Sequence, residues 1–251
     1  MTLVTDPQLC PSPTCPLHTP ANGGTPRYKA VLLFGAPGSG KGTQGRILDN
    51  IPGFYHSSTG DIFRSLDLQS EIGRVFWEYA GKGQLVPDEV VIRVWKQFIT
   101  GMELTNSFFP ETQILILDGL PRNVNQAKLL EDTIDVWKVI HLQADMNKMV
   151  ERLRRRALKE NRFDDANDAV VRKRLDVYER DTKPMLDYYP DEKIVPIDAM
   201  QPQIRVLTQI LNTVAPLKEQ IDKQAAEMTA QPQVTVQTAP PKVVAVPGAA
   251  V

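Results

Sequence analysis

One stretch, Ala30-Val-Leu-Leu-Phe-Gly-Ala-Pro-Gly-Ser-Gly-Lys-Gly-Thr43, carries most of the information about the fold, because an apolar run ends there in a glycine-rich loop with one lysine. Val31 to Phe34 predict a short buried strand. The loop glycines leave backbone N–H groups free to converge on phosphate oxygens where the next helix begins. Lys41 adds a positive charge that can reach the terminal phosphates. The stretch therefore predicts a nucleotide-phosphate site at the end of a strand.

Composition limits the classes of protein to consider. The chain has 251 residues, of which 42% are hydrophobic, and its 29 Lys and Arg nearly balance 30 Asp and Glu. This predicts a globular protein and argues against a general nucleic-acid or membrane binder. No apolar run is long enough to span a bilayer. The only cysteines, Cys10 and Cys15, rule out a disulfide framework and a four-cysteine zinc site. We therefore expect a cytoplasmic protein without zinc.

Three regions follow from changes in composition. Residues 1–27 are rich in proline and lack periodicity, which predicts a disordered leader. Residues 28–214 form the expected folded domain. Residues 215–251 turn to Pro, Gln, Ala and Val and predict a flexible tail. Within that tail, 217–228 could extend the last helix, but its apolar positions are too few to demand burial.

The folded domain alternates strand-like runs with helical patterns. The runs are 30–34, 53–56, 112–117, 137–142 and 193–197. Such alternation predicts a parallel five-stranded sheet flanked by helices, the α/β fold of phosphate-loop NTPases. In open parallel sheets the ligand binds beyond the carboxyl ends of the strands. The phosphate loop and Asp118-Gly119 should therefore meet at one edge, although they lie far apart in sequence.

Further motifs narrow the function. They are Ser58-Thr-Gly-Asp-Ile-Phe-Arg64, Gly83-Gln-Leu-Val-Pro-Asp88, and Asp118-Gly-Leu-Pro-Arg122 with Gln126 four residues on. In the phosphate loop, Gly42 occupies the usual hydroxyl position and Thr43 follows one residue late. With these motifs in this order, residues 28–214 resemble the adenylate kinases, nucleoside monophosphate kinases in their short-lid form.

The resemblance implies a monomer that transfers the terminal phosphate of MgATP reversibly to AMP, giving two ADP. It also implies a flap at 58–87 that holds AMP and a short lid at 156–166 over ATP, whose closure excludes water. The cations around the transferring phosphate would be Lys41, Arg64, Arg122, Arg156, Arg162 and Arg174. Arginine suits this work because its planar fork binds two phosphate oxygens.

The resemblance assigns two nucleotide sites. ATP would be bound by Gly38, Ser39, Gly40, Lys41, Gly42, Thr43, Arg156 and Gln201. AMP would be bound by Thr59, Gly60, Arg64, Gln84, Leu85, Val86, Gly119, Leu120, Pro121, Arg122, Gln126, Arg162 and Arg174. Thr43 and Asp118 would hold Mg²⁺, mainly through water.

Several alternatives stay open from the sequence. Thr59 also has the character of a helix N-cap. Arg172 is the alternative to Arg174, and Asp164 and Asp165 are equally explained by pairing with lid arginines or by capping the next helix. A UMP/CMP kinase on the same fold is disfavoured by Thr59 and Gln126. A non-catalytic nucleotide-binding regulator is disfavoured because every expected phosphate-facing cation is present.

Overall fold

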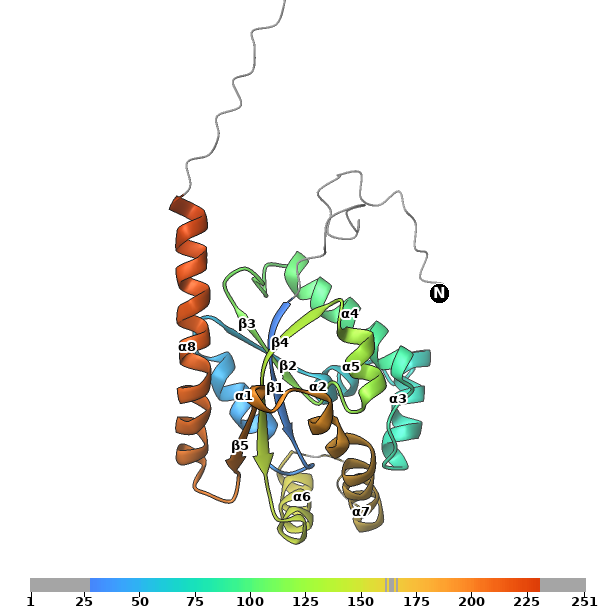
Figure 1. The fold of residues 1–251 in the computed structure, drawn as a ribbon. Coiled ribbons are helices and arrows are strands. Elements are labelled where there is room, and N and C mark those ends of the chain that lie inside the picture. Colours follow the sequence, from blue (N-terminus) through green and yellow to red (C-terminus); the bar gives the residue numbers. More distant parts are fainter. Residues whose placement is uncertain (1–27, 161, 163–164, 166, 231–251) are drawn as a thin grey trace, which may run out of the picture.

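The computed structural model describes residues 28–160, 162, 165 and 167–230, so the expected leader 1–27 and the last part of the tail, 231–251, lie outside the described residues (Figure 1). Five parallel strands form one sheet in the order β2-β3-β1-β4-β5. The strands are β1 (Tyr28–Gly35), β2 (Phe54–Ser58), β3 (Ile114–Asp118), β4 (Ile134–Gln143) and β5 (Ile194–Asp198). The predicted α/β fold with a parallel five-stranded sheet is confirmed.

Alternating side chains of the strands build two cores, one on each face of the sheet. Along β1, Ala30, Leu32 and Phe34 join one buried cluster, while Val31 and Leu33 join the other. This follows from the strand period of two, since successive side chains point to opposite faces. Both faces are covered, and the central strands therefore read as continuous apolar runs.

Helices cover both faces of the sheet (Figure 1). They are α1 (Lys41–Asp49), α2 (Thr59–Arg64), α3 (Glu71–Gly81), α4 (Asp88–Leu104), α5 (Val124–Leu130), α6 (Met146–Glu160), α7 (Asp168–Val177) and α8 (Gln203–Ala230). A π-helical turn (Tyr178–Thr182) continues α7, and 3₁₀ turns follow at Lys183–Tyr188 and Asp191–Lys193. Leu48 of α1 and Val206, Ile210 and Val214 of α8 pack in one core, whereas α4 contributes Trp95 to the other. Of the described helices, none combines the length and apolarity needed to cross a membrane.

The end of the folded part differs from the expected boundary at residue 214. Helix α8 continues to Ala230, and Ile221 is fully buried in the same core as Val214. Leu217 packs against that core as well. Leu217 and Ile221 follow Val214 by three and seven positions and lie on the same helix face. These two apolar residues are therefore enough to pack this part of α8 against the core. Of the tail expected to be flexible, residues 215–230 are helical, and they pack against the core through Leu217 and Ile221.

The sheet brings the predicted site motifs together at its carboxyl edge. Strand β1 pairs with β3 so that Leu33 lies opposite Asp118, which places the phosphate loop beside the end of β3. Strand β2 pairs with the other side of β3, with Ser58 opposite Asp118. The strand ends point toward α6 and α7 (Figure 1). Three motifs that are remote in sequence therefore border one space.

Candidate active site

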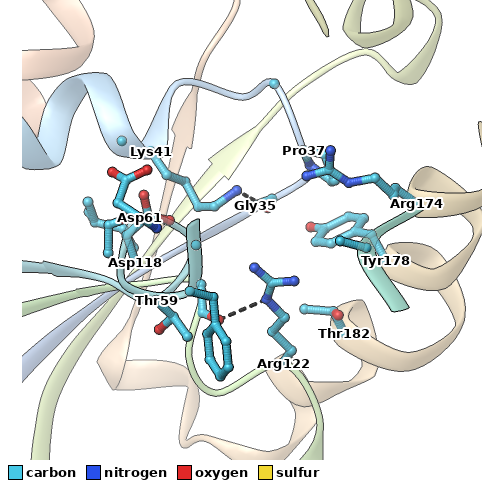
Figure 2. A pocket seen from close by; sticks show the side chains of 18 of the residues that line it. Gly35, Pro37, Lys41, Thr59, Asp61, Asp118, Arg122, Arg174, Tyr178 and Thr182 are labelled. Atoms are coloured by element: carbon cyan, nitrogen blue, oxygen red, sulfur yellow. Dashed lines mark hydrogen bonds between the residues drawn. The ribbon is translucent and has the colours of Figure 1, made fainter. Parts of the chain in front are cut away.

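A cavity of about 260 Å³ lies at this edge of the sheet, between the phosphate loop, the α2–α3 segment and the helices α6 and α7. Figure 2 shows Lys41, Arg122 and Arg174 reaching toward the same space from different sides. The cavity is lined by all six predicted catalytic cations, Lys41, Arg64, Arg122, Arg156, Arg162 and Arg174. A cavity with this lining is suited to a ligand with several negative charges.

The phosphate loop has the backbone that its glycines allow. Gly38 and Gly40 have φ angles of 85° and 101°, which side-chain-bearing residues rarely adopt. Gly40 directly precedes α1, so the first N–H groups of that helix face the loop. Ser39 is buried, and its Oγ has no hydrogen-bond partner among the described residues. It does not line the cavity, in contrast to the neighbouring loop residues predicted with it.

Lys41 contacts the phosphate loop through its ammonium group. Its Nζ donates hydrogen bonds to the carbonyl oxygens of Gly35, at 2.7 Å, and Ala36, at 3.0 Å. Burial lowers the pKa of Lys41 from 10.5 to about 8; Asp118 opposes this shift and nearby arginines add to it. Burial thus disfavours the charged form of Lys41, and a ligand with negative charge would favour it.

Asp118 ends β3 beside the start of α1. A Cβ added to Gly42 would lie 3.3 Å from its Oδ2 atom, so the glycine at the usual hydroxyl position makes room for the carboxylate. Burial raises the pKa of Asp118, but the adjacent His56 ring, whose Nε2 lies 3.8 Å from Oδ2, and the charge of Lys41 outweigh burial and hold that pKa below its usual value. Asp118 is thus a buried carboxylate kept ionised near the loop, as an acid that orients a metal ion would need to be.

Thr59 faces the cavity from the other side and does not cap a helix. The N-cap of α2 is Ser58, whose hydroxyl accepts a hydrogen bond from the backbone N–H of Asp61. Thr59 is the first helical residue, 4% exposed, and its Oγ1 has no hydrogen-bond partner among the described residues. The expectation that Thr59 caps the helix is wrong, because α2 begins at Thr59 itself and the preceding residue, Ser58, is the cap. A buried hydroxyl without a partner that lines a cavity indicates a ligand contact.

The motif after β3 orients its side chains through its own backbone. The Arg122 Nε donates to the carbonyl oxygen of Gly119 at 2.8 Å (Figure 2). The Arg122 backbone N–H donates to Oε1 of Gln126 at 2.7 Å. Gly119, Pro121, Arg122 and Gln126 line the cavity, whereas Leu120 is 2% exposed and packs in the core. The Leu120 side chain therefore does not face the cavity, in contrast to the prediction that Leu120 contacts AMP.

Asp165 joins two arginines of the lid region. It is fully buried, accepts a hydrogen bond from Nε of Arg156 at 2.7 Å and pairs with Arg174. Arg174 lines the cavity, whereas Arg172 is exposed on α7, so the structure places Arg174 rather than Arg172 at the site. Asn167 caps α7, which leaves pairing with arginines as the role of Asp165. Asp164 lies outside the described residues.

Asp61 lies within ion-pair distance of arginines from three segments. It pairs with Arg64 within α2, lies 3.5 Å from Nη2 of Arg162 and 3.8 Å from Nη1 of Arg46 on α1. Burial raises the pKa of Asp61, but hydrogen bonding and charge from Arg64, with the charge of Arg162, hold it below its usual value. Asp61 therefore supplies negative charge beside Arg64 and Arg162.

The remaining predicted site residues differ in whether they line the cavity. Gly38, Gly40, Gly42, Thr43, Gly60, Gln84, Leu85 and Val86 line the cavity. Gln201 does not; it lies between β5 and α8, near Gln209.

Sequence reasoning missed other lining residues, namely Arg46, Arg152, Tyr178 and Thr182. Arg152 could have been found from its spacing, since it stands four residues before Arg156 and shares its helix face. For Tyr178 and Thr182 the sequence holds no comparable signal, because a π-helical turn changes which side chains face the site.

Comparison with known proteins adds the family. The profile of the family described as adenylate kinase matches residues 33–194. The chain belongs to the adenylate kinase family. It is 37% identical to the adenylate kinase of Porphyromonas gingivalis over 171 residues, which cover 66% of this chain and 84% of that protein. It is also 37% identical to that of Cyanothece sp. over 195 residues, covering 75% and 96%, and 31% identical to that of Caldicellulosiruptor bescii over 206 residues, covering 69% and 93%.

Membership of this family confirms the predicted enzyme class. The chain is an adenylate kinase-type phosphotransferase that moves a phosphate group reversibly between ATP and AMP. Of the functions that the sequence left open, family membership favours the adenine-specific enzyme over a UMP/CMP kinase and over a non-catalytic regulator.

Proposed function

We propose that the chain transfers the terminal phosphate of MgATP to AMP within the described cavity, with ATP on the phosphate loop and AMP on the α2–α3 side. The observation that carries this assignment is the convergence of six cations from α1, α2, the segment after β3, the lid region and α7 on one cavity. Two phosphate tails repel each other, so bringing them into line requires such a set of positive charges.

The residues act by positioning and by stabilising charge. Lys41, now bound to two loop carbonyls, exchanges these for oxygens of the ATP phosphates. Arg122 and Arg174 face the same space and bind the transferring phosphate, where their charge stabilises the transition state. Arg64 and Arg162, paired with Asp61 in this structure, hold the AMP phosphate. An oxygen of the AMP phosphate forms the new P–O bond as the bond between the β- and γ-phosphates of ATP breaks and ADP leaves, so no covalent enzyme intermediate is needed.

Mg²⁺ fits the oxygen donors beside the phosphate loop. Asp118 is buried and kept ionised there, and the Thr43 hydroxyl belongs to the same cavity lining. We assign these two side chains to Mg²⁺, with water and nucleotide phosphates completing its shell. When bound, the ion neutralises charge on the phosphate oxygens.

The choice of AMP over UMP or CMP rests on Thr59 and Gln126. Thr59 offers a buried hydroxyl without a partner, and Gln126 lines the same side of the cavity with its amide. An amide can pair with the edge of adenine through one donor and one acceptor. We further propose that flap and lid close over both nucleotides and that the enzyme acts as a cytoplasmic monomer. The contact of Gln201 with the ATP base stays a prediction for the closed state.

The experiment compares AMP, UMP, CMP and GMP as acceptors with MgATP, following each diphosphate. We expect a strong preference for AMP, and expect Lys41→Met to remove nearly all activity while the thermal unfolding temperature changes little. Lys159→Met, at an exposed lysine late in α6, is the matched control and should keep full activity. A preference for UMP or CMP would refute the roles of Thr59 and Gln126, and near-normal kcat in Lys41→Met would refute the mechanism.

A further inference from the structure

A carboxylate outside the cavity holds the amide that faces it. Asp88, the first residue of α4, accepts a hydrogen bond from Nε2 of Gln126 at 2.7 Å and one from Nδ2 of Asn123 at 2.9 Å, both on Oδ1. Its Oδ2 accepts a third from Nδ2 of Asn125 at 2.7 Å. Asp88 does not line the cavity, whereas Gln126 does. Asp88 can therefore reach a bound nucleotide only through Gln126.

The two contacts of the Gln126 amide settle its orientation. Its Oε1 accepts from the backbone N–H of Arg122, which can only donate, and its Nε2 donates to the Asp88 carboxylate, which can only accept. Turning the amide over would place a donor against a donor and an acceptor against an acceptor. Gln126 is 1% exposed, so water cannot replace the lost bonds.

This fixed orientation has a consequence for the base. After the two contacts, Gln126 has one further lone pair on Oε1 and one further hydrogen on Nε2 to offer a ligand. Adenine presents a 6-amino donor next to the N1 acceptor, and these match that pair. Hypoxanthine presents a 6-oxo acceptor next to an N1–H donor, so the same pose requires the amide to be turned over.

We propose that Asp88 is a positioning residue that sets the specificity of the acceptor site for 6-amino over 6-oxo purine monophosphates by fixing the Gln126 amide. The inference rests on the proposed function, in which Gln126 reads the AMP base. Hydrogen bonds from Asn125, Asn123 and Gln126 outweigh burial and hold the pKa of Asp88 below its usual value, so it stays an acceptor at neutral pH.

The test is the ratio of kcat/KM for AMP to that for IMP, which differs from AMP in this base edge alone. Asp88→Asn keeps the shape of the side chain but no longer presents acceptors alone to Gln126, so of the two contacts that oppose turning the amide over only the one with the Arg122 N–H stays fixed. We expect the AMP to IMP ratio to fall by about tenfold or more, because an unmatched buried donor or acceptor is the main penalty against IMP. Asp88→Ser, whose hydroxyl can donate or accept, should lower the ratio as well and serves if Asp88→Asn does not fold.

Two controls separate this role from helix stability. Glu89→Gln removes the same charge from the same helical turn at an exposed position, and Asn125→Ala removes only the partner of Oδ2. Both should leave the ratio within about twofold of the original chain. If Asp88→Asn lowers kcat/KM for AMP and IMP equally, or leaves the ratio unchanged, Asp88 only supports α4 and the inference is wrong. If the unaltered chain fails to phosphorylate AMP, the proposed function fails instead.

Discussion

Lys41 should make nucleotide binding depend on pH in a way that the structure specifies. In the free enzyme, burial lowers its pKa to about 8, and Arg122, Arg156 and Arg174 add to the effect although Asp118 opposes it. A bound triphosphate supplies negative charge at the same place, so Lys41 is protonated in the complex. Binding above pH 8 therefore takes up a proton, and the affinity must fall as the pH rises.

The size of the effect follows from the protonated fraction of the free enzyme. With a pKa of about 8, Lys41 is roughly three-quarters protonated at pH 7.5 and about one-tenth protonated at pH 9. The Kd for the triphosphate should therefore rise about eightfold between these values. The nucleotide does not add to this slope, because phosphate groups with a second pKa of about 6 are ionised throughout the range.

The assay is isothermal titration calorimetry with a non-hydrolysable ATP analogue, without AMP, at pH 7.5 and 9 in two buffers of different ionisation enthalpy. The buffers report the proton uptake directly. Lys41→Arg is the matched control, because arginine stays charged at both values and should remove the slope even if it weakens binding. A constant Kd in the original chain, or an equal slope in Lys41→Arg, would refute the reasoning.

Three other changes test separate parts of the structure. Asp165→Asn leaves Arg156 and Arg174 without their common carboxylate, so kcat should fall by about 10²-fold in steady-state assays with both nucleotides saturating. Thr59→Ala removes one hydrogen bond of about 1 kcal/mol, so KM for AMP should rise about fivefold while KM for ATP is unchanged; an equal rise in both would contradict the assignment. Ile221→Ala should lower the free energy of unfolding by about 2 to 4 kcal/mol in urea titrations, and no loss would show that the end of α8 does not stabilise the domain.

The sequence was sufficient where a residue's role depends on its own neighbours in the chain. Short apolar runs predicted the strands, and the glycines with Lys41 predicted the phosphate loop, because both signals are local properties of the sequence. It failed at Thr59, since α2 begins one residue earlier than a cap at Thr59 would give, and the neighbouring Ser58 is the cap. It also failed at the end of α8, where packing against the sheet, rather than the number of apolar residues, decides whether Ile221 is buried.

The arrangement of the arginines was the hardest part to predict because shared carboxylates position them. The cavity is lined by seven arginines and Lys41, although the whole chain carries a formal net charge of −1. Asp61 holds side chains from α1, α2 and the lid region, and Asp165 joins the lid region to α7. Each carboxylate thus lowers the repulsion between the cations that converge on the cavity. No single segment contains this information, since each contact joins residues that the chain alone does not place together.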